Sequence, residues 1–345
     1  MTVRVSLFSR GIQWHVEYTT EREKAWVAMS EVSHGAESVQ VAQPRQEGIV
    51  VSKPVARVMM LVNAIVWGTG YTMLKHTQDN MPTQWLMFFR MGAATLLMAM
   101  VFFPRLRRIR LRRYVMPGLV LALMTYWMGF LFQLKGLETT SPGRNSFFTD
   151  TYCVMVPFIV WAFTRRRPNW QHLVAAFVCA FGIGLVSLSG GGGDELMHMS
   201  FGDTMTIIGA FFFALNLVLV GFMGRGFDAI ALMLMEFVWC TVLFGGGAVL
   251  FEGAPSVAWA RWDIILCIGY LVVGSTVIAQ VFQTIAIQNL PTSEASVILS
   301  TECIFAMLVS VLFAGERLTV PSVCGFALIF GAILLSEVQL PARRR

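Results

Sequence analysis

Charge is scarce in this sequence. Of its 345 residues only 13% are charged, while 56% are apolar, and the mean hydropathy is +0.65. A soluble domain carries roughly 25% charged residues, so this chain lacks the polar surface that keeps a domain in water. The net charge of +6 comes from short basic clusters between apolar runs. That pattern excludes a nucleic-acid partner and indicates a lipid bilayer instead.

The motifs of enzymes and metal sites are also missing. The six cysteines contain no C-x-x-C pair, and the histidines form no H-E-x-x-H. Neither G-x-S-x-G nor the phosphate-binding G-x-x-x-x-G-K-[ST] occurs. Each of these motifs brings together groups that the corresponding chemistry needs. Their absence predicts a protein that is not an enzyme and that uses neither a metal nor another cofactor.

Long apolar runs are abundant, and each is close to the roughly 20 residues that cross a bilayer as a helix. The polar segment 1–56 before them is expected to be a disordered cytoplasmic tail, and Met29 is an alternative start. A Gly-rich loop at 189–202 and a basic tail at 339–345 are the other polar segments. The sequence thus predicts an all-α integral membrane protein with ten transmembrane helices, at about 58–75, 84–103, 115–135, 146–163, 170–188, 204–223, 229–251, 263–287, 294–314 and 320–338.

Arginine predicts the orientation. The strongly basic segments are 105–113, 165–167 and 343–345, and each follows an even-numbered run. The connection after the fifth run has two acidic residues and no lysine or arginine. Basic loops stay on the cytoplasmic side. We therefore expect both termini in the cytoplasm of a bacterial cell and a multi-pass protein of its plasma membrane.

Two parts of the chain are similar at a nearly constant spacing. Residues 132–167 match 282–317, which lie 150 positions later, and Leu86-Met87 matches Leu232-Met233, 146 positions later. The matches predict two copies of one five-helix unit, 57–188 and 203–338. Because five is odd, the copies have opposite orientations in the membrane. Inverted repeats of this kind let a transporter expose a midplane site to each side in turn.

The order of several short motifs resembles the drug/metabolite transporter superfamily, in particular its EamA-type proteins. The resemblance covers about 57–338 and implies a secondary transporter that exports or exchanges metabolites without ATP. Cys303 departs from the proline common in this family, which predicts that the run at 294–314 is straighter than the run with Pro157. The matching residues are Trp67-Gly68, Phe89-Arg90, Pro157, Gly315-Glu316-Arg317-Leu318-Thr319, Gly325 and Gly331.

Four charged residues lie well inside apolar runs: Arg90, Asp150, Glu236 and Glu302. A charge at the centre of a membrane helix costs about 2.5–3.5 kcal/mol on insertion scales, so these groups should face a cavity, pair or be neutral. Arg90 and Glu236 occupy equivalent positions of the two repeats and are expected to be coupled. We expect Asp150 and Glu302 to control transport by changing protonation or by binding a cationic group. The alternative is a structural role, in an ion pair or bonded to neighbouring hydroxyls.

Further polar and aromatic residues are candidates for the wall of the transport cavity, although interhelical hydrogen bonding is the commoner role of such groups. We expect the first four helices of each repeat to enclose the cavity and the fifth helices to brace it. Small residues on these fifth helices fit close packing, either with each other or with a second protomer in a homodimer. The further cavity candidates are Trp67, Tyr71, Trp127, Asn145, Tyr152, Asn216 and Gln283.

The sequence favours transport of a small, amino acid-like or drug-like metabolite, in the export direction and coupled to protons. A channel, a passive scaffold and an intramembrane enzyme are the alternatives. A channel or a scaffold would not require an inverted repeat with polar residues at matching depths. An enzyme would need a catalytic constellation that the sequence lacks.

Overall fold

The computed structural model describes residues 3–8, 11–16, 51–165, 167–188, 200–223, 227–254, 259, 261–290, 295 and 298–337. The chain divides into two compact units, 1–41 and 42–345. In the first unit, β1 (Val3–Phe8) pairs antiparallel with β2 (Gly11–Val16). The alternation of apolar and polar residues in Val3-Arg4-Val5-Ser6 and Ile12-Gln13-Trp14-His15 fits these strands. The expectation of a disordered tail over 1–56 stays a prediction, because most of this segment lies outside the described residues. The loop 189–199, and most of the remaining tail, lie outside the described residues.

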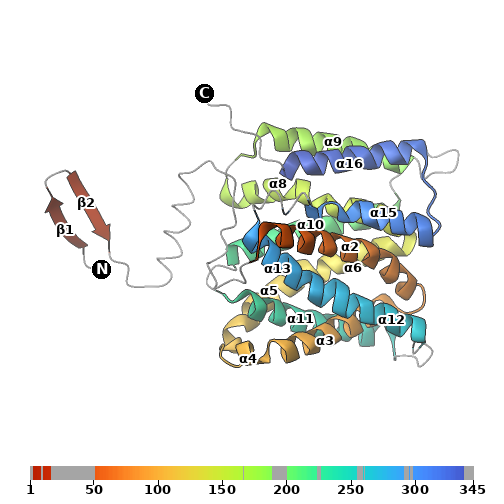
Figure 1. Cartoon of the computed structure of the whole chain (residues 1–345), viewed down its shortest axis with the longest axis horizontal. Helices are drawn as coiled ribbons and strands as arrows, with labels where there is room; N and C mark the ends of the chain where they lie inside the picture. The colour runs from red at the N-terminus through yellow and green to blue at the C-terminus, as the bar shows by residue number, and fades with distance from the viewer. Residues whose placement is uncertain are drawn as a thin grey trace. The chain divides into compact units, whose positions relative to one another are not determined.

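The second unit is helical, and helical residues coincide with all ten predicted runs (Figure 1). Six helical stretches are long and apolar enough to cross a membrane, and three more are apolar but shorter. Several runs consist of more than one element. The elements are α2 (Lys53–Gln78), α3 (Thr83–Val101), α4 (Phe103–Leu106), η1 (Leu111–Tyr114), α5 (Val115–Leu121), η2 (Ala122–Trp127), α6 (Met128–Thr139), α7 (Pro142–Asp150), α8 (Tyr152–Thr164), α9 (Trp170–Leu188), α10 (Phe201–Met223), α11 (Ala229–Gly247), η3 (Ala248–Glu252), α12 (Trp262–Tyr270), η5 (Leu271–Ile278), α13 (Ala279–Asn289), α15 (Glu302–Phe313) and α16 (Val320–Glu337).

Helices of one half of the chain pack mainly against helices of the other half. The fifth helices, α9 and α16, pack against each other, and so do the second helices, α3 and α11. These two pairs lie on opposite sides of the bundle (Figure 1). The first helix of the first half, α2, packs on α13 and α15, while its counterpart α10 packs on α6 and α8. Each half therefore places its first helix against the third and fourth helices of the other half, as two related repeats should.

The fourth helix of each half is interrupted at an equivalent threonine. A turn at Thr151 separates α7 from α8, and a turn at Ser300 and Thr301 precedes α15. The Thr151 hydroxyl donates to the Phe148 carbonyl at 2.6 Å, and the Thr301 hydroxyl donates to the Ile298 carbonyl at 2.6 Å. Both helices thus break 150 residues apart with the same bond. Whether Cys303 leaves the later helix straighter than the one with Pro157 stays a prediction.

Two further features recur at the same spacing. The third helix of each half contains a π-helical stretch, η2 in the first and η5 in the second. Left-handed backbone follows α8 at Arg165 (φ 59°) and α15 at Gly315 (φ 68°), which again lie 150 residues apart. Matching side chains alone arise by chance among apolar helices, whereas matching irregularities of the backbone do not. The local geometry thus supports the repeat that the sequence predicts.

Candidate functional site

Asp150 and Glu302 face each other at the two helix breaks. Asp150 is the last residue of α7, and Glu302 is the first residue of α15. Their side chains lie close together, and they are only 2% and 5% exposed. We expected both near the middle of continuous helices, and the structure instead places them where the helices are interrupted. Each repeat thus contributes one buried carboxyl group to a single pair.

A chain of hydrogen bonds connects the Asp150–Glu302 pair with three other helices. The Tyr71 hydroxyl, on α2, lies 3.5 Å from Glu302 Oε1 and donates to it. The Gln133 amide, on α6, donates to Tyr71 Oη at 3.3 Å and to Thr149 Oγ1 at 3.0 Å. Asn145 in turn donates to the Gln133 carbonyl at 3.1 Å and to Thr206 Oγ1, on α10, at 2.7 Å. These bonds hold the helices around the carboxyl pair in one arrangement.

Several polar atoms near this pair lack a protein partner. Oδ2 of Asp150, Oε2 of Glu302 and Oδ1 of Asn145 accept no hydrogen bond from the residues that the structure describes. On α2, the Asn63 side chain is fully buried, and both its amide nitrogen and its oxygen are unpartnered. A buried polar atom without a partner costs about 1–3 kcal/mol, and more if it is charged. The interior is therefore equipped to bind a proton, a cation or a polar group supplied from outside the chain.

Arg90, on α3, belongs to a second group, which it forms with residues of the π-helical stretch η5. Its Nε donates to Thr276 Oγ1 at 3.0 Å, and its Nη2 donates to Ser275 Oγ at 3.2 Å. Its guanidinium carbon also lies 5.3 Å from the centre of the Phe130 ring. The Trp67 indole donates to the Ser275 carbonyl at 2.8 Å. Because Trp67 and Tyr71 are one helical turn apart on α2, this helix links the arginine group to the carboxyl pair.

Glu236 lies in a third group, where the Asn216 amide donates to its Oε1 at 2.8 Å. The remaining candidates are dispersed. Trp127 packs near Phe244 and its indole nitrogen is unpartnered, Tyr152 packs against two core clusters, and Gln283 is half-buried on α13. The predicted residues therefore form separate groups, of which only Tyr71, Asn145, Asp150 and Glu302 belong to the carboxyl site.

Sequence reasoning gave too little weight to the hydroxyl and amide side chains that complete these groups: Gln133, Thr149, Thr206, Ser275 and Thr276. Gln133 had a signal, because it matches Gln283 in the repeat. Threonine and serine occur too often in membrane helices to stand out in one sequence. Within the described part of the chain, no group of three or more His, Cys, Asp or Glu side chains is arranged to hold a metal ion.

Comparison with known proteins identifies the family. The model of the EamA-like transporter family matches the chain twice, over 55–188 and 200–337. An uncharacterized transporter of Archaeoglobus fulgidus is 25% identical over 306 residues, which are 88% of this chain and 93% of the relative. A solved crystal structure, described only as that of a protein, is similar with a TM-score of 0.59 and 14% identity, over 82% of this chain and 96% of the other.

The two family matches coincide with the two halves that exchange their helices, and the relative is similar over nearly its whole length. The likeness to the solved structure concerns the fold alone. The protein is thus a multi-pass membrane transporter of the drug/metabolite type, without an enzymatic activity. The chain belongs to the EamA-like transporter family.

Proposed function

We propose that the protein is a secondary transporter that moves a small metabolite across the bacterial plasma membrane by alternating access, in the export direction, and that Asp150 and Glu302 form its coupling and binding site. The substrate is amino acid-like or drug-like and carries a cationic group. The observation that supports this proposal is the carboxyl pair itself, with one member from each repeat, buried at matching helix breaks.

Electrostatics explains why such a pair suits coupled transport. Two adjacent carboxylates in a low-dielectric interior repel each other, so the doubly ionised state is unfavourable. A proton shared by the pair, or a cationic group between them, removes this repulsion. The two occupants therefore compete for one site, which is the condition for exchanging protons for substrate. The unpartnered oxygens of both residues are available to either occupant.

Alternating access follows from ten membrane crossings in two inverted repeats, with both termini in the cytoplasm. A site on the axis that relates the repeats can be exposed to either side by exchanging their conformations. The interrupted helices fit this role, because broken helices in transporters supply polar backbone and side chains at membrane depth. Both carboxyl groups are nearly inaccessible here, which corresponds to an occluded state between the two exposed ones.

The test is transport by the purified protein in liposomes, with and without a pH gradient, for the wild type, Asp150→Asn and Glu302→Gln. Candidate amines and amino acids are first screened for thermal stabilisation of the protein. We expect each variant to insert normally and to lose gradient-driven flux. Glu138→Gln is the control, because Glu138 bears a carboxyl at the surface, paired with Lys135, and should retain the flux. Wild-type flux in both site variants refutes the role of the pair, and flux that never saturates indicates a channel.

A further inference from the structure

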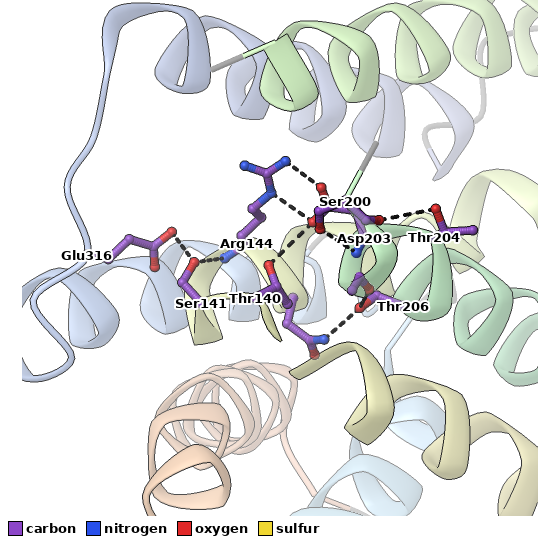
Figure 2. Close-up of polar contacts among 10 residues, drawn as sticks. Thr140, Ser141, Arg144, Ser200, Asp203, Thr204, Thr206 and Glu316 are labelled. Atoms are coloured by element: carbon purple, nitrogen blue, oxygen red, sulfur yellow. Dashed lines mark hydrogen bonds and ion pairs between the residues drawn. The ribbon is translucent and has the colours of Figure 1, made fainter. Parts of the chain in front are cut away.

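A separate cluster of polar contacts joins the repeats at the start of α7, the short helix that ends at Asp150 (Figure 2). Arg144 forms an ion pair with Asp203 of α10, through two guanidinium nitrogens and both carboxylate oxygens. Asp203 is fully buried, and its Oδ1 also accepts a hydrogen bond from Thr140 at 3.3 Å. A buried pair that loses one partner leaves a costly charge behind, so this contact holds firmly while it is intact.

Glu316 makes the second contact, from the connection between α15 and α16. Its Oε1 accepts from the Ser141 hydroxyl at 2.5 Å, and its Oε2 accepts from the Gly143 backbone N–H at 3.2 Å. The Ser310 hydroxyl also donates to Oε2, at 2.5 Å. A carboxylate at a helix N-terminus compensates the free N–H groups and the positive end of the helix dipole. A Cβ at position 143 would lie 2.6 Å from Glu316 Oε2, so a larger residue there would displace this carboxylate.

The helix between these contacts and the carboxyl pair is short. It spans nine residues, from Pro142 to Asp150, and the turn at Thr151 separates it from α8. Six residues, or about 9 Å along a helix axis, separate Arg144 from Asp150. Thr149 and Asn145 of the same helix bond to Gln133 and Thr206. A displacement of α7 thus changes the carboxyl site and the contacts at its N-terminus together.

We propose that Arg144, Asp203, Ser141 and Glu316 form a gate latch, which holds α7 against the second repeat and closes one end of the transport path. The inference rests on the proposed function, since a gate needs a path. Because the arginine-rich segment 165–167 follows α8, at the other end of the fourth helix, the latch is at the face expected to be extracellular. It keeps that face shut in the present state, and its release frees α7 to carry Asp150 away from Glu302.

Hydrogen exchange of the α7 backbone tests the latch without any transport measurement. In Glu316→Gln the side chain keeps its shape but loses its negative charge. Hydrogen bonds to charged groups are about twice as strong as neutral ones. We expect exchange across 142–150 to become about tenfold faster or more. Ser141→Ala removes one donor to Glu316 and also the hydroxyl that caps α7 by accepting from the Arg144 N–H at 3.4 Å; it should also speed exchange and serves if Glu316→Gln does not fold.

Glu252→Gln is the matched control. The Glu252 carboxylate accepts hydrogen bonds from the backbone N–H groups of Gln84 and Trp85 at the start of α3, so it too binds a helix N-terminus. This variant should speed exchange at the start of α3 and leave α7 unchanged. Unchanged α7 exchange in both Glu316→Gln and Ser141→Ala overturns the latch, as does equal acceleration of α7 by Glu252→Gln, which would reveal a general loosening.

A reversible cross-link tests whether the latch must open. In the double variant Ser141→Cys, Glu316→Cys, a short bis-methanethiosulfonate reagent joins the two thiols through a disulfide at each end and spans the gap that the shorter side chains leave. We expect the reagent to stop flux in liposomes and reduction to restore it, while each single-cysteine variant keeps its flux under both treatments. Full flux with the cross-link verified by mass spectrometry overturns the gate. Hydrogen exchange measures α7 directly. The latch is therefore tested separately from the proposed function, even if Asp150→Asn and Glu302→Gln keep wild-type flux.

Discussion

The contact between α9 and α16 depends on two glycines, which makes it a sharp test of the packing. An ideal Cβ built on Gly182 would lie 2.9 Å from the Gly325 carbonyl oxygen and 3.1 Å from the Ile329 nitrogen. A Cβ on Gly325 would lie 2.7 Å from the Gly182 oxygen and 2.9 Å from the Val186 nitrogen. Backbone atoms of a helix cannot rotate away as a side chain can, so the two helices must separate to admit a methyl group.

The expected magnitude follows from this geometry. Overpacking a well-filled contact costs about 1–3 kcal/mol, and alanine regains up to about 1 kcal/mol over glycine by its helix propensity. Gly182→Ala and Gly325→Ala should each destabilise the protein by about 1–2 kcal/mol net. Because the two sites touch, the double variant should cost less than the sum, since helices already separated by one methyl group admit the second more easily.

The chain provides its own controls two and six residues further along the same helices. A Cβ on Gly184 or on Gly331 would meet no other atom within 4 Å. Alanine at either position should therefore leave stability unchanged or raise it slightly. The measurement is thermal unfolding of each purified variant in detergent, followed by the fraction that stays monodisperse. Equal losses at Gly182 and Gly184 would refute the packing described here.

Three further outcomes are expected. Reversing the charge of Arg90 and that of Glu236 should destabilise the protein additively, because Arg90 bonds to Ser275 and Thr276 while Glu236 bonds to Asn216; recovery of folding in the double reversal would instead show that the two groups interact. Thr151→Val with Thr301→Val removes both hydroxyl bonds at the helix breaks, each worth about 1 kcal/mol. The double variant should lose flux in liposomes while it still unfolds cooperatively in a thermal melt. A cysteine introduced within 189–202 should react with an impermeant reagent from outside intact cells; labelling only after permeabilisation would contradict the orientation.

The helical architecture was predictable because bilayer thickness imposes a length that apolar runs reveal. The repeat was predictable because duplication left the same residues at a fixed spacing. The breaks at Thr151 and Thr301 were not predicted, since threonine bonding to a carbonyl three residues earlier resembles an ordinary helical threonine in sequence. Thr151 and Thr301 do lie 150 positions apart, which is the spacing of the repeat. This spacing identifies them as equivalent once the backbone is known.

The candidate site was predicted in part. The sequence identifies Asp150 and Glu302 as candidates because a charged group inside a membrane is costly and is retained where it has a partner or a function. Their mutual contact required the packing of α7 against α15, which no pattern in the sequence shows. For Arg90 the sequence suggested Glu236 as the partner, while the described bonds lead to Ser275 and Thr276. Equivalence under the repeat relates residues in sequence, and it does not by itself bring them into contact.

The ion pair of Arg144 with Asp203 has a counterpart in the sequence with its signs exchanged. The 150-residue spacing leads from Arg144 to Glu294, and the 146-residue spacing leads back from Asp203 to Arg57. The sequence thus places opposite charges at these equivalent positions of the two repeats, in either order. Replacing Arg144 by glutamate together with Asp203 by arginine should therefore be tolerated where either reversal alone is not.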